Sequence, residues 1–70
     1  MIMRFEQAIV YVLANAGHGM TTAAIAQTIN EEMLYVRNDG KPVSDKQVYV
    51  MVRKFEQVFA REGGLIYLIM

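Results

Sequence analysis

The sequence predicts an α+β fold that is mainly α, with three helices followed by a C-terminal β-hairpin. Apolar residues recur at helical spacing in three successive segments, and β-forming residues flank a Gly-Gly pair near the end of the chain. A chain of 70 residues fits one domain, residues 1–70. This order of elements is that of a winged helix-turn-helix, in which the hairpin is the wing.

The first helix is predicted from Arg4 to Ala16, because one side of a 3.6-residue helix collects its apolar residues. These are Phe5, Ala8, Ile9, Val12, Leu13 and Ala16. Gly17 ends the helix, since glycine readily adopts the left-handed conformation that closes a helix. The Gly17-His18-Gly19 segment redirects the chain, and Met20 is expected to form a short extended link.

The second helix begins at Thr21 or Thr22, either of which can accept a bond from a free backbone N–H. Ile25, Ile29 and Met33 mark its apolar periodicity. Residues 34–37 are then predicted to be extended, residues 38–40 to turn, and residues 41–43 to return. Because Pro42 lacks a backbone donor, this loop is expected to form at most a small hairpin.

The third helix is predicted to begin at Ser44 and to end at Phe59. Ser44 and Gln47 have the spacing of a capping box, in which each side chain bonds the other residue's backbone N–H. The apolar arc of this helix holds Val48, Met51, Val52, Phe55 and Phe59. The opposite arc holds Lys46, Tyr49, Val50, Arg53 and Gln57, with Lys54 at its margin.

The closing hairpin is predicted to pair Val58 to Arg61 with Leu65 to Ile69. Glu62-Gly63-Gly64 provides the turn between the two strands. The second strand is rich in residues that favour β-structure.

These residues resemble a known family, the HARE-HTH domain. The resemblance extends over nearly the whole chain and is carried by a pattern of apolar and small residues: Phe5, Ala8-Ile9, Val12-Leu13, Ala16-Gly17, Met20-Thr21-Thr22, Ile25-Ala26 and Ile29. Residues 35–43 depart from the family pattern, because they lengthen the link before the third helix. This winged-helix module occurs in the delta subunit of bacterial RNA polymerase and in restriction-associated proteins. The resemblance implies a DNA-binding or transcription-associated role.

The sequence carries no pattern typical of an enzyme, a cofactor site or a metal site. The chain has no cysteine, and its single histidine, His18, lies between two glycines without a positioned partner. Glu31, Glu32 and Asp39 lack the spacing of metal ligands. We therefore expect a non-enzymatic protein without a cofactor or a bound metal.

A membrane or secreted location is also not expected. The longest apolar runs are far shorter than the ~20 residues of a membrane-spanning helix. Although Arg4 precedes an apolar run, Glu6 and Gln7 interrupt the pattern of a secretory signal, and its cleavage would remove the first helix. The sequence thus favours a soluble, cytoplasmic protein.

The net charge of zero conceals an uneven distribution. From Met33 to Arg61 the chain has six basic and three acidic residues, whereas the remainder has one basic and four acidic residues. The positive part covers the third helix, the preceding loop and the base of the wing, which in a winged helix face DNA. The candidate DNA-binding residues are Arg37, Lys41, Lys46, Gln47, Tyr49, Val50, Arg53, Lys54, Gln57 and Arg61. With few basic residues, binding is expected to be weak and salt-dependent.

The alternative is a protein-interaction or dimerisation module of the same fold. Tyr49 and Val50 lie on the outward arc of the third helix, where apolar side chains are typical of partner surfaces. The apolar segment from Leu65 to Met70 also offers a strand edge for a homodimer. Packing of this strand against Met1, Ile2 and Met3 is the competing interpretation, and the sequence leaves both open.

Overall fold

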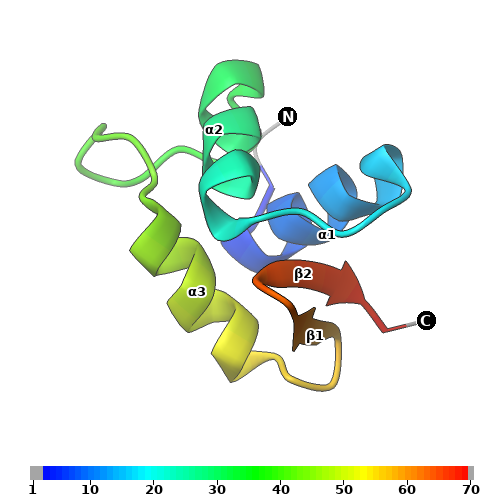
Figure 1. Ribbon diagram of the computed structural model, residues 1–70. Coiled ribbons are helices and arrows are strands. Elements are labelled where there is room, and N and C mark those ends of the chain that lie inside the picture. Colours follow the sequence, from blue (N-terminus) through cyan, green and yellow to red (C-terminus); the bar gives the residue numbers. More distant parts are fainter. Residues whose placement is uncertain (1–2, 70) are drawn as a thin grey trace.

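The structure is a computed structural model that describes residues 3–69. Three helices, α1 (Phe5–Ala16), α2 (Thr22–Glu32) and α3 (Asp45–Lys54), precede two antiparallel strands, β1 (Phe59–Glu62) and β2 (Leu65–Leu68), as Figure 1 shows. The two strands and the turn between them form the wing. The predicted fold class is confirmed: the protein is a mainly helical α+β domain with a winged-helix-like layout.

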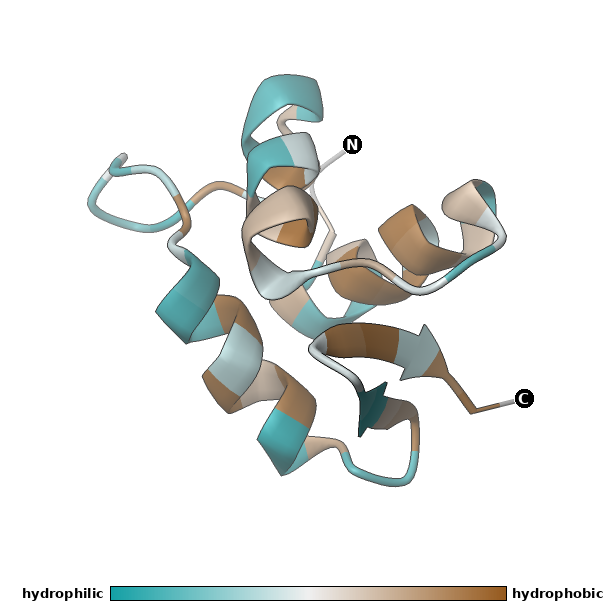
Figure 2. Ribbon diagram, viewed as in Figure 1, coloured by the Kyte–Doolittle hydropathy of each residue, from teal (hydrophilic) through white to brown (hydrophobic). Residues whose placement is uncertain are grey.

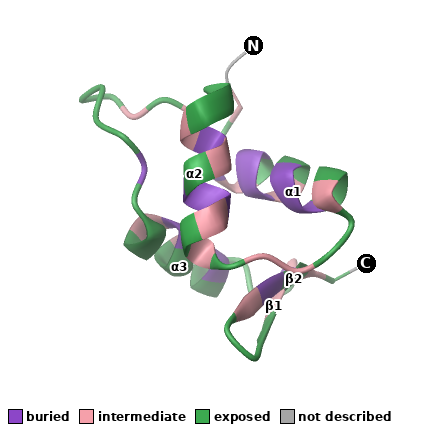
Figure 3. Cartoon of the chain, turned by 45° about the horizontal axis from the view of Figure 1, so that its top comes forward, coloured by how far each residue is buried: buried purple, intermediate pink, exposed green. Residues whose placement is uncertain are grey.

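The core lies where the three helices meet the wing. Each helix contributes one apolar stripe, and the hydrophobic segments face inward in Figure 2 while the buried residues line the same interior in Figure 3. The buried residues are Phe5, Ala8, Ile9, Val12, Leu13, Ile25, Ala26, Ile29, Val43, Val48, Val52, Phe59 and Ile66. The predicted stripe of α1 is confirmed from Phe5 to Leu13, and in α2 Ile25 and Ile29 are buried as predicted. The assignment of Met33 to the second stripe is wrong, because Met33 follows the end of α2 with a φ of 52° and is 67% exposed.

The ends of the helices follow the predicted local chemistry. Gly17 has a φ of 73°, and its N–H donates to the Leu13 carbonyl at 3.1 Å, which closes α1. At the start of α2, the Thr21 hydroxyl accepts a bond from the Ala24 N–H at 3.1 Å. The predicted capping box of Ser44 is also present, because Ser44 Oγ accepts from the Gln47 N–H while Gln47 Oε1 accepts from the Ser44 N–H.

The wing has a two-residue turn. Gly63 (φ 58°) and Gly64 (φ 80°) both adopt positive φ, as a two-residue type I′ turn requires. The register pairs Glu62 with Leu65 and Phe59 with Leu68. The predicted hairpin exists, but its first strand is shifted by one residue, running from Phe59 to Glu62 and not from Val58 to Arg61. Its second strand ends at Leu68 and not at Ile69.

Met20 forms a short extended link, as predicted, and it pairs with β2. Its N–H donates to the Ile66 carbonyl at 3.0 Å, and the Ile66 N–H donates back at 2.7 Å. At Ile66, β2 therefore lies between Arg61 of β1 and Met20. The strand edge that was predicted to be free for a partner is thus covered at Ile66.

The predicted end of the third helix is wrong, because α3 stops at Lys54 and not at Phe59. Phe55 has φ −113° and ψ 53°, and the chain turns there toward the wing. Phe59 is buried as predicted, but from β1, where the hairpin register pairs it with Leu68. Gln57 consequently lies in the turn and not on the helix.

The predicted small hairpin in residues 34–43 is not formed, and this segment contains no strand. A turn does occur, since the Gly40 N–H donates to the Arg37 carbonyl at 3.0 Å. The returning limb is instead held by Asn30 of α2, whose side-chain amide donates to the Val43 carbonyl and accepts from the Val43 N–H, both at 2.9 Å.

The proposed packing of the N-terminus on the last strand lies largely outside the described residues. Met1, Ile2 and Met70 are not among them. The Met3 N–H donates to the Leu34 carbonyl at 2.9 Å, and the Met3 side chain packs against the core. The N-terminal chain is thus tied to the link that follows α2.

Candidate nucleic-acid interface

Helix α3 has one buried face and one exposed face. Val48 and Val52 are buried on the inner side, where α3 packs against α2, α1 and β1. The opposite side is exposed and alternates polar and apolar residues along the helix (Figure 2). Its members are Lys46, Tyr49, Val50, Arg53 and Lys54. The predicted faces are therefore confirmed within α3. Phe55, predicted on the apolar arc, instead lies just after the helix and is 36% exposed.

Tyr49 joins the exposed face of α3 to the wing. Arg61 of β1 donates from Nη1 to the Tyr49 hydroxyl at 2.7 Å, and its guanidinium lies 4.9 Å from the centroid of the Tyr49 ring. The Arg53 guanidinium lies 5.9 Å from the same centroid. An aromatic ring attracts nearby cations through its quadrupole, so the Tyr49 ring is a shared contact of two guanidinium groups.

A shallow hollow lies next to these contacts. It has a volume of about 330 Å³ and is lined by Tyr49, Val50, Arg53 and Lys54. We call Tyr49, Arg53, Lys54 and Arg61 the arginine cluster. Arg53 and Arg61 lie near the Tyr49 ring, and Lys54 lines the same hollow as Tyr49 and Arg53. Sequence reasoning named all four residues, but it did not predict the contact between Tyr49 and Arg61.

Two other predicted residues have structural contacts at the start of α3. Arg37 pairs with Asp39 at 2.7 Å and donates from Nη1 to Gln47 Oε1 at 3.2 Å. Gln47 Oε1 also accepts from the Ser44 N–H at 3.0 Å. Arg37 and Gln47 therefore connect the loop to the cap of α3, whereas Lys41 is exposed in the loop.

Sequence reasoning missed Asn30 and Gly19. Asn30 sets the position of the loop before α3, but no local motif indicates a side chain that bonds a backbone 13 residues away. At Gly19, an added Cβ would lie 2.5 Å from the Tyr67 ring, so only glycine allows this ring to lie against the α1–α2 link.

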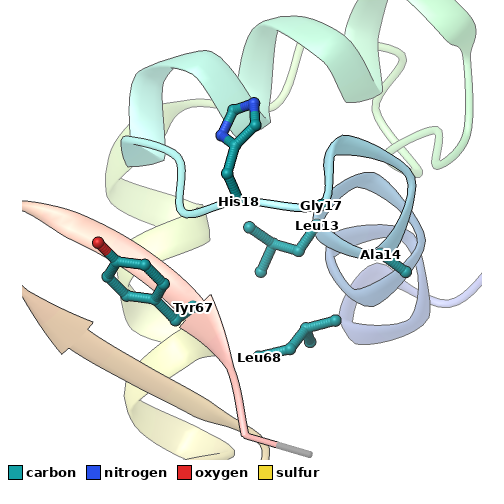
Figure 4. A pocket seen from close by; sticks show the side chains of 6 residues that line it. All are labelled: Leu13, Ala14, Gly17, His18, Tyr67 and Leu68. Carbon is teal, nitrogen blue, oxygen red and sulfur yellow. The ribbon is translucent and has the colours of Figure 1, made fainter.

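A second hollow of about 340 Å³ lies between the end of α1 and β2. It is lined by Leu13, Ala14, Gly17, His18, Tyr67 and Leu68 (Figure 4). The His18 ring points away from Leu13 and Leu68 in Figure 4, and its Nδ1 lies 2.8 Å from the Gly19 carbonyl oxygen. Within residues 3–69, no three acidic or histidine side chains come together in a group that can hold a metal ion.

Comparisons with protein-family models, with curated proteins and with solved structures find no match to this chain. The similarity to the HARE-HTH domain thus remains a prediction from the sequence. Across residues 3–69, no helix has the length and apolar character needed to span a lipid bilayer.

Proposed function

We propose that the chain is a DNA-binding or transcription-associated winged-helix module that acts in the cytoplasm without catalysis. The exposed face of α3 would be the recognition element, with the wing beside it. The observation that carries this proposal is the arginine cluster, which brings Arg53 and Lys54 of α3 and Arg61 of β1 onto one surface. Guanidinium and ammonium groups are the main partners of phosphate in protein–DNA contacts.

The arrangement of α3 supports duplex DNA as the ligand. In helix-turn-helix proteins one helix enters the major groove and flanking segments contact the backbone. Lys46 and Arg53 lie two helical turns apart on the exposed face, and Arg61 extends this positive surface onto the wing. With Lys54, this surface has four basic side chains, which neutralise about four phosphates. This number predicts a slope of about −3 to −4 for log K against log salt concentration.

A fluorescence anisotropy titration tests the proposal with a labelled duplex of ~20 base pairs at ~50 mM salt, where phosphate contacts are least screened. We expect Arg53→Ala and Lys46→Ala each to weaken binding several-fold and to reduce the salt slope by about one. Asn15→Asp is the matched control, because it also lowers the net charge by one, and Asn15 is exposed at the end of α1. A wild-type protein that shows no binding at this salt concentration rules the proposal out.

A second candidate function is protein interaction or homodimer formation. It is favoured by Val50, which is 56% exposed beside Tyr49, and by Ile69, which is 50% exposed after β2. Exposed apolar side chains next to aromatic residues are typical of partner surfaces. Light scattering over a concentration series tests the homodimer. If the protein is monomeric throughout and Ile69→Lys changes nothing, this form of the proposal fails.

A further inference from the structure

We infer that the duplex binding proposed above is independent of base sequence: the module holds the phosphate backbone and does not read base edges. This inference rests on the proposed function and specifies its ligand as duplex DNA of any sequence. It comes from the hydrogen bonds at the start of α3, which differ from what a base-reading helix requires.

The polar side chains in the first turn of α3 are directed at the helix's own backbone. Ser44 Oγ accepts from the Gln47 N–H at 3.2 Å, and Asp45 Oδ1 accepts from the Lys46 N–H at 3.0 Å. Gln47 Oε1 accepts from the Ser44 N–H at 3.0 Å. In helix-turn-helix proteins, the N-terminal residues of the recognition helix contact the bases. Here these residues cap the helix that carries them.

Gln47 is the side chain in this turn best suited to reading a base, and its acceptor oxygen is already occupied. Glutamine recognises adenine by donating from its amide nitrogen while its oxygen accepts. Gln47 Oε1 already accepts from the Ser44 backbone and, at 3.2 Å, from the Arg37 guanidinium. Pairing with adenine would therefore break both the cap and the contact that holds the loop to α3.

The exposed residues nearest to Gln47 on α3, Lys46 and Val50, do not replace it in base recognition. Lys46 presents a flexible point charge, which suits phosphate better than a fixed base edge. Val50, one turn further, has no hydrogen-bonding group in its side chain. Lys46 and Val50 thus offer charge and an apolar contact, and no bidentate pairing with a base.

The contacts among Tyr49, Arg53 and Arg61 suit phosphate. Tyr49 accepts a hydrogen bond from Arg61 and holds the Arg53 guanidinium near its ring, which restricts both arginines before a ligand arrives. The contacts join the C-terminal part of α3 to the wing, and elements that flank a recognition helix contact the DNA backbone. The guanidinium donors of Arg53 and Arg61 are therefore expected to bind the DNA backbone.

Selection from a random duplex library, followed by anisotropy titration of the selected and unselected pools at ~50 mM salt, tests the inference. One bidentate base contact discriminates between sequences by roughly 5- to 150-fold. We expect less than about threefold difference in Kd between the pools, well below this range. A selected sequence bound more than about fivefold better overturns the inference but leaves DNA binding intact. Absence of binding to both pools overturns the proposed function together with the inference.

Gln47→Ala provides a second measurement that does not depend on folding yield. Partial unfolding multiplies every apparent Kd by the same factor, so the ratio of Kd values for an A·T-rich and a G·C-rich duplex is unaffected. We expect this ratio to equal that of the wild type, although the variant loses the capping contact. Lys46→Ala is the control and should weaken both duplexes equally. A Gln47→Ala ratio shifted by more than about fivefold, the lower limit for one base contact, contradicts the inference.

Discussion

Valine residues lie on both faces of α3, but their surroundings differ. Val48 and Val52 are 0% and 2% exposed against the core, whereas Val50 on the other face is 56% exposed. The inner face has no charged residue, and the outer face carries Lys46, Arg53 and Lys54. One helix thus separates the side chains that hold the fold from those offered to a ligand. Substitutions should therefore affect stability and binding independently.

The largest effect that this comparison predicts is on stability. Val48→Ala removes two methyl groups from a fully packed position, and we expect a loss of about 2–3 kcal/mol in the free energy of unfolding. In a domain this small, such a loss approaches the total stability. Urea titration followed by circular dichroism at 222 nm measures it.

Val50→Ala is the matched control, because it makes the same substitution on the same helix. We expect a change below about 0.5 kcal/mol, since Val50 is mainly in solvent and alanine favours the helix. Equal losses for Val48→Ala and Val50→Ala would show that the two faces are not distinct in energy.

A smaller effect is expected at the contact that positions α3. Asn30→Ala removes two hydrogen bonds and leaves the backbone N–H and C=O of buried Val43 without their partner, which costs about 1–2 kcal/mol. Faster amide exchange at Val43 would accompany this loss. Asn15→Ala, at an exposed position of α1, is the control and should be near neutral. An unchanged exchange rate at Val43 in Asn30→Ala would contradict this assignment.

The sequence was most informative where structure is decided by neighbours along the chain. The stripe from Phe5 to Leu13, the Thr21 cap and the Ser44 capping box all depend on residues within four positions, and all are confirmed. Helical periodicity failed at Phe59, because a buried phenylalanine fits the same apolar arc whether the chain continues as a helix or enters a strand.

The rest of the site depends on contacts between distant segments. The charges around Tyr49 were predicted from their spacing, but the bond from Arg61 depends on the register of the wing, which is set by the Gly63-Gly64 turn. Similarly, the amide of Asn30 bonds a backbone 13 residues away. Such contacts have no local sequence signal, so they emerge only from the packed structure.

The smallest predicted effect on stability is at Arg53. Its guanidinium lies 5.9 Å from the Tyr49 ring centroid in an exposed setting, so the contact contributes at most about 0.5–1 kcal/mol. Alanine has the higher helix propensity, which offsets part of that contribution. We expect Arg53→Ala to change the free energy of unfolding by less than about 0.5 kcal/mol while weakening duplex binding several-fold.

Measuring urea unfolding and duplex affinity on the same Arg53→Ala preparation decides whether the exposed face acts independently of the core. A binding defect with unchanged stability places the lost interaction between the protein and DNA. A stability loss above about 1 kcal/mol would instead mean that Arg53 supports the fold through Tyr49. In that case the arginine cluster would stabilise the fold, as the inner face of α3 does. The two faces of α3 would then not act independently at Arg53.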